Sequence, residues 1–178
     1  VLTGNCTHGL NIAIRTLVKP GDRVVISGFE HNAVTRPLHG LGAKITVAGR
    51  KLFDWEDTLR DFRNALDAGA EAAIFTHVSN VFGYILPVEE MSRMCRDRGI
   101  PFIIDAARSA GTMPVSLKNL GADFIAMPGH KGLLGPQGTG GLIVAPGVDV
   151  RPLLTGGTGV QTHLPHQPEE FPTRLEAG

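Results

Sequence analysis

Short apolar runs alternate along the chain with longer stretches of helical periodicity, and this alternation restricts the fold more than any other feature. The apolar runs have the length and composition of buried strands and lie at residues 23–27, 44–48, 71–79, 101–105, 123–127 and 141–145. Amphipathic stretches with apolar residues at helical spacing flank them, at residues 7–18, 32–41, 54–66 and 88–98. Apolar strands joined through helices indicate a mostly parallel sheet with helices on both faces. We therefore predict a three-layer α/β fold.

Charge and composition exclude several classes of protein. The 178 residues contain 17 Lys and Arg against 17 Asp and Glu, so no basic excess favours binding to nucleic acid or to a membrane surface. Hydrophobic residues make up 42%, unlike a disordered chain, and no apolar run approaches the roughly 18 residues that cross a bilayer. Cys6 and Cys95 have neither paired nor zinc-ligand spacing. We therefore expect no disulfide framework, no metal site and a cytoplasmic location.

The patterning divides the chain into two parts. Residues 1–154 carry the strand and helix signals and are expected to form one large domain, incomplete at its N-terminal side. Residues 155–178 are rich in Gly, Pro and His, and we expect a loop or tail that leads to the rest of an enzyme. His163 and His166 in this tail lack further ligands at metal-binding spacing and are expected to be solvated. Because the chain opens at Val1 inside a patterned segment, we expect a central piece of a longer enzyme.

Polar side chains follow the predicted strands, at the edge where α/β sheets bind ligands. Asp105 ends an apolar run and is followed by small residues, so it either faces a flat heteroaromatic ligand or caps the next loop. Lys131 lies in a Gly-rich loop and is either a nucleophilic amine in a dry cleft or a solvent-facing side chain. His31 either stacks on a planar ligand or simply begins a helix. Asn80 follows another strand and could donate to a ligand oxygen.

The turn at residues 4–9 precedes a predicted helix and contains two glycines. Its backbone N–H groups and the Thr7 hydroxyl have the chemistry of a phosphate site at a helix N-terminus. Many turns between strands and helices share this composition, so the turn alone does not identify a ligand.

Five motifs occur in a characteristic order. They are TGNCTHGLN at residues 3–11, EHNA at 30–33, SNVFG at 79–83, DAARSAG at 105–111 and GHKGLLGPQGTGGL at 129–142. In combination they resemble the class V aminotransferase-fold enzymes, which are pyridoxal-phosphate enzymes of fold type I. Within that family the sequence is most similar to cysteine desulfurases and selenocysteine lyases. The resemblance spans nearly the whole chain.

The resemblance implies a role for four residues around the cofactor ring. Lys131 would hold pyridoxal 5'-phosphate as a Schiff base and carry protons during the reaction. Asp105 would pair with the protonated pyridine nitrogen, which keeps the ring an electron sink. His31 would stack on the ring and assist proton transfer, and Asn80 would bond its phenolic oxygen.

The resemblance also implies a phosphate site, with two departures from the family pattern. Cys6 and Thr7 would bind the phosphate largely through backbone N–H groups, and His130 would add a contact. Arg108 stands where desulfurases usually carry Gln, which would place a positive charge near the phenolic oxygen unless the side chain swings away. Pro128 stands where many carry Ser or Thr, and it lacks even a backbone donor.

The implied reaction is removal of sulfur or selenium from cysteine or selenocysteine, leaving alanine. The resemblance further implies a homodimer, with the tail at its interface, and a sulfur-acceptor protein as partner. In desulfurases the persulfide-forming Cys and the substrate-binding Arg follow the segment matched here, and neither Cys6 nor Cys95 is placed to replace that Cys. Transamination, another β- or γ-elimination, or a non-catalytic assembly domain remain alternatives. The presence of both Lys131 and Asp105 counts against the assembly domain, which needs neither residue.

Overall fold

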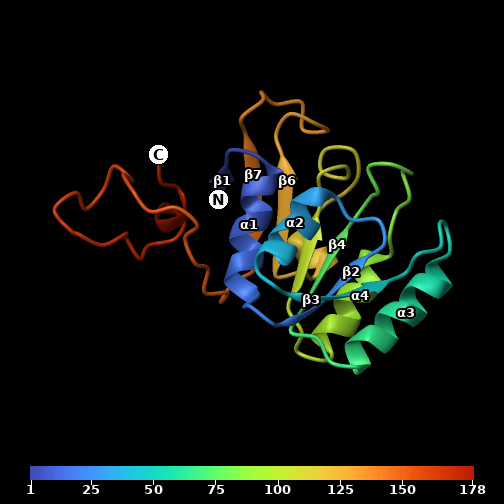
Figure 1. The fold of residues 1–178 in the computed structure, drawn as a ribbon. Helices are drawn as coiled ribbons and strands as arrows, with labels where there is room; N and C mark the ends of the chain where they lie inside the picture. Colours follow the sequence, from blue (N-terminus) through green and yellow to red (C-terminus); the bar gives the residue numbers. More distant parts are fainter.

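The computed structural model describes residues 1–178 and contains one seven-stranded sheet with helices on both faces (Figure 1). The strands lie side by side in the order β1-β7-β6-β5-β4-β2-β3. In chain order the elements are β1 (Leu2–Thr3), α1 (Cys6–Leu17), β2 (Arg23–Ser27), α2 (Asn32–Gly40), β3 (Lys44–Ala48), α3 (Trp55–Asp67), β4 (Ala72–Thr76), α4 (Val88–Arg96), β5 (Phe102–Asp105), α5 (Leu117–Leu120), β6 (Phe124–Pro128), β7 (Gly140–Val144) and the 3-10 turn η1 (Thr173–Leu175). The predicted mostly parallel α/β fold is confirmed.

The sheet is parallel from β3 to β6 and antiparallel at its other edge. Strand β7 pairs antiparallel with β6, and β1 pairs antiparallel with β7. No helix lies between β6 and β7, and the loop at residues 129–139 turns the chain straight back, whereas a parallel neighbour would need a crossover. The short elements β1, α5 and η1 were not predicted from the sequence. The predicted strand at residues 71–79 is shorter in the structure, where β4 ends at Thr76.

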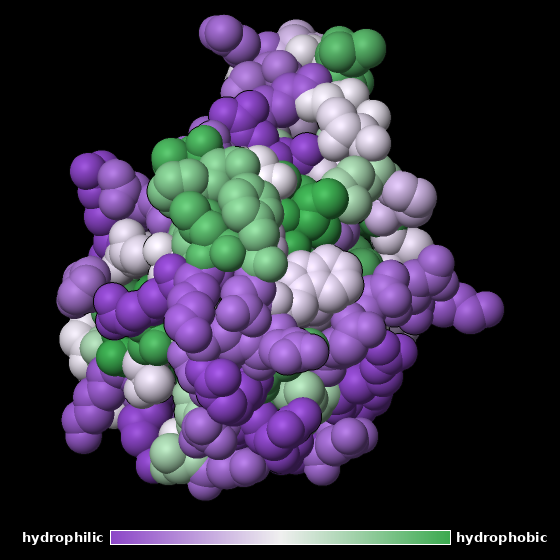
Figure 2. Space-filling model, turned by 90° about the vertical axis from the view of Figure 1, so that its right-hand side faces the viewer, coloured by the Kyte–Doolittle hydropathy of each residue, from purple (hydrophilic) through white to green (hydrophobic).

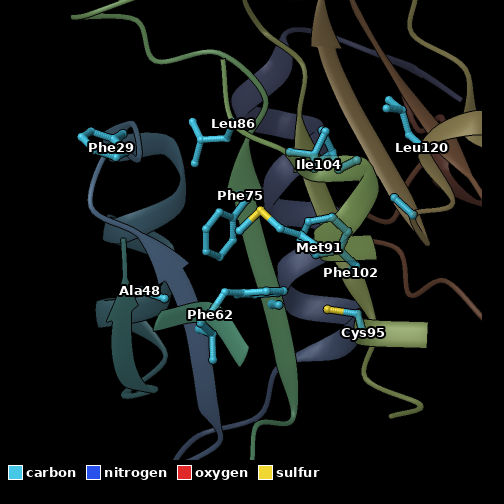
Figure 3. Close-up of a cluster of buried hydrophobic side chains, with 14 of the residues drawn as sticks. Phe29, Ala48, Phe62, Phe75, Leu86, Met91, Cys95, Phe102, Ile104 and Leu120 are labelled. Carbon is cyan, nitrogen blue, oxygen red and sulfur yellow. The ribbon is translucent and has the colours of Figure 1, made fainter. Parts of the chain in front are cut away.

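Two apolar cores lie on opposite faces of the sheet because alternate strand residues point to opposite sides. On one face Val24, Ile74 and Ile103 pack against α1 and α2. On the other face Phe75 and Phe102 pack against Phe62 of α3 and Met91 of α4 (Figure 3). Asp105 follows Ile103 by two residues in β5, so its side chain lies on the face that α1 covers.

The tail at residues 155–178 swings away from the sheet and then returns to it (Figure 1). Its returning end contains η1, whose Leu175 is buried in the core beside Val150. Arg174 pairs with Asp149, and the Leu2 N–H donates to the Glu176 carboxylate at 2.6 Å. A boundary near residue 154 remains a prediction.

Apolar side chains gather on the face that Figure 2 shows, where the loops after β3 and β4 meet. The Trp55 indole N–H donates to the Ile85 carbonyl at 2.8 Å and joins these loops. Phe53, Trp55 and Ile85 line a shallow hollow of about 400 Å³ between them.

None of the helices combines the length and the hydrophobicity that crossing a bilayer requires.

Candidate active site

Asp105 is a buried carboxylate at the carboxyl end of β5, with only 3% of its surface exposed. Its Oδ1 atom accepts hydrogen bonds from the Ala107 N–H at 2.8 Å and from the Cys6 thiol at 3.4 Å. It forms no ion pair with any Lys, Arg or His of the chain. Burial raises the pKa of the Asp105 carboxyl, and the two hydrogen bonds and the charges of Lys131 and His31 offset part of this rise. The carboxylate therefore lacks a cation in direct contact.

The first turn of α1 places backbone donors beside this carboxylate. Asn5 caps the helix by accepting from the His8 N–H at 2.9 Å. The N–H groups of Cys6 and Thr7 donate to no atom of the chain, as expected for the start of a helix. The Cys6 side chain turns inward to Asp105, and burial followed by the Asp105 charge raises the pKa of its thiol far above the ordinary value. Cys6 therefore offers a neutral thiol and a free backbone N–H.

Lys131 lies in the loop at residues 129–139, between β6 and β7. The Gly129 N–H donates to the Thr139 carbonyl at 2.8 Å and the Gly135 N–H donates to the Gly129 carbonyl at 2.7 Å, which closes the loop on itself. Lys131 is half-buried and forms no ion pair. Its positive charge lies close enough to Asp105 to lower the pKa of that carboxyl. The structure thus brings Lys131, Asp105 and Cys6 into one neighbourhood.

His31 is the N-cap of α2 and is exposed. Its Nδ1 atom accepts from the Ala33 N–H at 3.1 Å, so the neutral ring carries its proton on Nε2. A positive charge on the His31 ring would lower the pKa of Asp105. The two sequence-based interpretations of His31, helix start and site residue, are therefore compatible.

The remaining predicted site residues lie at exposed positions of the surrounding loops. Asn80 is in the loop after β4, Arg108 follows β5, and His130 precedes Lys131. None of their side chains forms a hydrogen bond or an ion pair within the chain. Pro128 is the last residue of β6 and pairs in register with Gly140. The ligand roles of these residues remain predictions.

Sequence reasoning missed Glu30, which lies beside His31 at the same edge of the sheet. Its Oε1 atom accepts from the Ser27 hydroxyl at 2.5 Å and from the Thr76 N–H at 2.7 Å. Burial raises the pKa of Glu30 to about 8. The motif EHNA contains Glu30, but a Glu in a loop is usually solvated, so only the fold reveals its burial. No group of three His, Cys, Asp or Glu side chains comes together as a metal site.

The profile of the family described as "Aminotransferase class-V" matches residues 1–178. The chain belongs to the class V aminotransferase family. The predicted family is thereby confirmed.

Several relatives within the class V family are named cysteine desulfurases. The chain is 36% identical to a probable cysteine desulfurase of Methanothermobacter thermautotrophicus, covering 100% of the chain and 46% of the relative. It is 37% identical to a probable cysteine desulfurase of Pyrococcus abyssi, covering 99% and 46%. The apo structure of a cysteine desulfurase from Thermococcus onnurineus superposes with a TM-score of 0.83 at 34% identity, covering 100% and 47%. The chain thus spans about half the length of these class V relatives.

Proposed function

We propose that these residues form the cofactor-binding part of a pyridoxal-phosphate-dependent cysteine desulfurase or selenocysteine lyase. The proposed reaction removes sulfur or selenium from the amino acid and leaves alanine. Support comes from the relatives named cysteine desulfurase, which match the chain over its whole length. Further support comes from the chemistry of the groups around Asp105.

The observation that carries the proposal is the buried Asp105 carboxylate without a cation. A carboxylate that is removed from water needs a positive charge or several donors to stay ionised. Asp105 has two donors, both on Oδ1, and no ion pair. A protonated pyridine nitrogen supplies the missing positive charge, so the residues present fit pyridoxal phosphate. Such a cation would also return the pKa of Asp105 toward its ordinary value.

The start of α1 and the Lys131 loop fit the other ends of the same cofactor. The free N–H groups of Cys6 and Thr7 and the positive end of the α1 dipole suit a phosphate. Lys131 supplies an amine that can bond to the cofactor's aldehyde carbon. We assign to His31, Asn80, Arg108 and His130 the further contacts that the family resemblance implies.

When bound, pyridoxal phosphate supplies an electron sink for the bonds at the amino acid's α-carbon. The protein's part is to hold, orient and exchange protons. Asp105 keeps a negative charge at one side of the site, sheltered from water on the face that α1 covers. Lys131 would hold the cofactor through its side-chain amine and would carry a proton to or from the α-carbon. His31, held by the Ala33 N–H, keeps its Nε2 proton directed away from its own helix.

Neither cysteine of the chain can serve as the sulfur-accepting nucleophile. The Cys6 thiol donates a hydrogen bond to Asp105 and is buried. Cys95 is buried in the core on the opposite face of the sheet, and burial raises its pKa to about 12. A thiol needs to ionise before it attacks sulfur. We therefore propose that residues 1–178 alone do not release sulfur from cysteine.

The test is product analysis with the whole protein, pyridoxal phosphate, an added thiol reductant and either cysteine or selenocysteine. The reductant is needed because two electrons convert the removed sulfur or selenium to sulfide or selenide. Alanine together with sulfide or selenide supports the proposal, provided that a Lys131→Ala variant forms neither. A keto acid formed with an amino-group acceptor would instead assign transamination. Lys131-dependent sulfide release by residues 1–178 alone would contradict the assignment of the nucleophile to another part of the protein.

The quaternary and cellular context belongs to the same proposal. We propose a homodimer and a sulfur-acceptor protein as partner, as the resemblance implies, and a cytoplasmic location, as the cysteine content indicates. Sedimentation of the whole protein measures the first, and cysteine-dependent sulfur transfer to co-purified proteins measures the second. A monomeric, fully active protein would contradict the dimer.

A further inference from the structure

Glu30 joins the ends of two strands at the edge of the sheet that carries the proposed site. It lies in the turn between β2 and α2, and it reaches across to the end of β4. Beyond Ile26 and Ile74 the two strands no longer pair, so the Thr76 N–H lacks a backbone partner from β2. The Glu30 Oε1 atom accepts a hydrogen bond from this N–H. It also accepts one from the hydroxyl of Ser27, which is the last residue of β2.

The second oxygen of the same carboxyl has no partner. Glu30 Oε2 is buried and receives no hydrogen bond. Glu30 also forms no ion pair with any Lys, Arg or His of the chain. A buried carboxylate in this position would leave its charge uncompensated. A neutral carboxylic acid avoids that cost, because Oε1 keeps its two donors and the proton lies on Oε2.

Asp105 gives a second reason for a neutral Glu30. Thr76 pairs in register with Asp105 across β4 and β5, so the two acidic side chains lie at the same edge of the sheet. The negative charge of Asp105 acts on Glu30, and the adjacent titratable group on its own turn is His31. Two carboxyl groups in one buried site cannot both ionise without a large cost in free energy. A neutral Glu30 therefore leaves Asp105 as the charged carboxylate that can hold a cation.

We propose that Glu30 is a positioning residue that works as a protonated acid, fixing the turn that places His31 while adding no negative charge beside Asp105. The role in catalysis rests on the proposed function, whereas the protonation and the fixed turn do not. In agreement with this assignment, burial raises the pKa of Glu30 to about 8.

The experiment compares the whole wild-type protein, without cofactor, with Glu30→Gln and Glu30→Ala. Glutamine resembles the neutral acid, since its amide oxygen can accept from Ser27 and Thr76. We expect Glu30→Gln to preserve the ¹⁵N signals of the His31 ring, with Nδ1 as acceptor. We expect Glu30→Ala to perturb them and, relative to Glu30→Gln, to shift the folding equilibrium about tenfold or more toward the unfolded state, because the Thr76 N–H loses its partner.

The pH dependence of unfolding gives the deciding sign. A carboxyl with a raised folded pKa contributes stability that is present below the unfolded value and is lost as the pH rises toward the folded value. The folding constant of wild type relative to Glu30→Gln should therefore fall, by up to about tenfold per pH unit, between about pH 4.5 and pH 8. It should level off above pH 8. The exposed Glu169→Gln should show no such trend.

The outcomes separate this inference from the proposed function. The inference is overturned if the folding constant of wild type relative to Glu30→Gln rises with pH. It is also overturned if Glu30→Gln perturbs the His31 ring signals as strongly as Glu30→Ala does. Either result would show an ionised Glu30. A falling ratio with preserved His31 signals supports it. Failure of the whole wild-type protein to take up pyridoxal phosphate would overturn the proposed function. The His31 signals and the pH dependence of unfolding are measured without cofactor, so they would still decide the role of Glu30.

Discussion

Gly111 and Gly132 touch backbone to backbone, and this contact seats the Lys131 loop on the turn that follows Asp105. A Cβ atom on Gly111 would lie 2.2 Å from the carbonyl carbon and oxygen of Gly132. A Cβ atom on Gly132 would lie 2.4 Å from the Ala110 carbonyl oxygen. Real Cβ atoms do not approach backbone so closely, so both positions need glycine. The position of Lys131 relative to Asp105 therefore depends on the absence of a Cβ atom at Gly111 and at Gly132.

The first prediction concerns Gly111→Ala. The methyl group must push the Lys131 loop away, because backbone on the other side cannot yield. Overpacking of this kind costs about 1–3 kcal/mol, and the positive φ of 84° adds about 1–2 kcal/mol for an L-residue. We expect lower stability in urea unfolding and reduced attachment of pyridoxal phosphate to Lys131.

Gly147→Ala is the matched control. Gly147 has the same φ of 84°, but no atom lies within 4 Å of its added Cβ. It should show the backbone cost alone and normal attachment of the cofactor. Equal loss of attachment in both variants would mean that the Gly111–Gly132 contact does not position Lys131.

The second prediction concerns the bond between Lys131 and the cofactor. With the whole protein and pyridoxal phosphate, borohydride reduction should fix the cofactor's mass on the peptide that contains Lys131, because a lysine amine bonds to carbonyl compounds. Lys131→Ala should abolish this mass increase. Lys118→Ala, on the exposed surface of α5, should retain it. Labelling of Lys118 or Lys51 in the wild type instead would refute the site.

The third prediction separates the charge of Asp105 from its shape. Asp105→Asn keeps an oxygen that can accept from the Ala107 N–H but removes the negative charge. We expect the cofactor still to bind while turnover falls by about 10²–10³-fold, the usual loss when one preorganised electrostatic group is removed. The measurement is kcat with cysteine, together with the cofactor's absorbance. Near-normal kcat would place the pyridine nitrogen elsewhere.

The fourth prediction concerns the core between the sheet and α3. Phe62 is fully buried, and its ring centroid lies 4.9 Å from that of Phe75 (Figure 3). Phe62→Ala should lower the free energy of unfolding by about 3–5 kcal/mol, because it leaves a cavity. Leu164→Ala, in the exposed tail, should change it by about 0.5 kcal/mol or less. Equal effects would contradict the assignment of Phe62 to the core.

The local sequence pattern and the order of the motifs determined the fold class and the family of this protein. Strand-length apolar runs and helical periodicity identified the α/β layers, because both periods follow from backbone geometry and are visible in short windows. The motifs around Asp105 and Lys131 identified the family, and the position of Asp105 at a strand end follows from the same pattern. His31 was foreseen at a helix start, which the Ala33 N–H confirms.

Tertiary structure alone decided which groups meet at the site. Cys6 and Asp105 are 99 residues apart in sequence, and Glu30 and Thr76 are 46 apart. Local periodicity carries no information about such pairs, since contact depends on which strands become neighbours and in what register. The antiparallel edge of β7, the inward turn of the Cys6 thiol and the burial of the Glu30 carboxyl follow from that neighbourhood. The sequence specifies which chemical groups the protein carries. The packing of distant strands determines their ionisation and their hydrogen-bond partners.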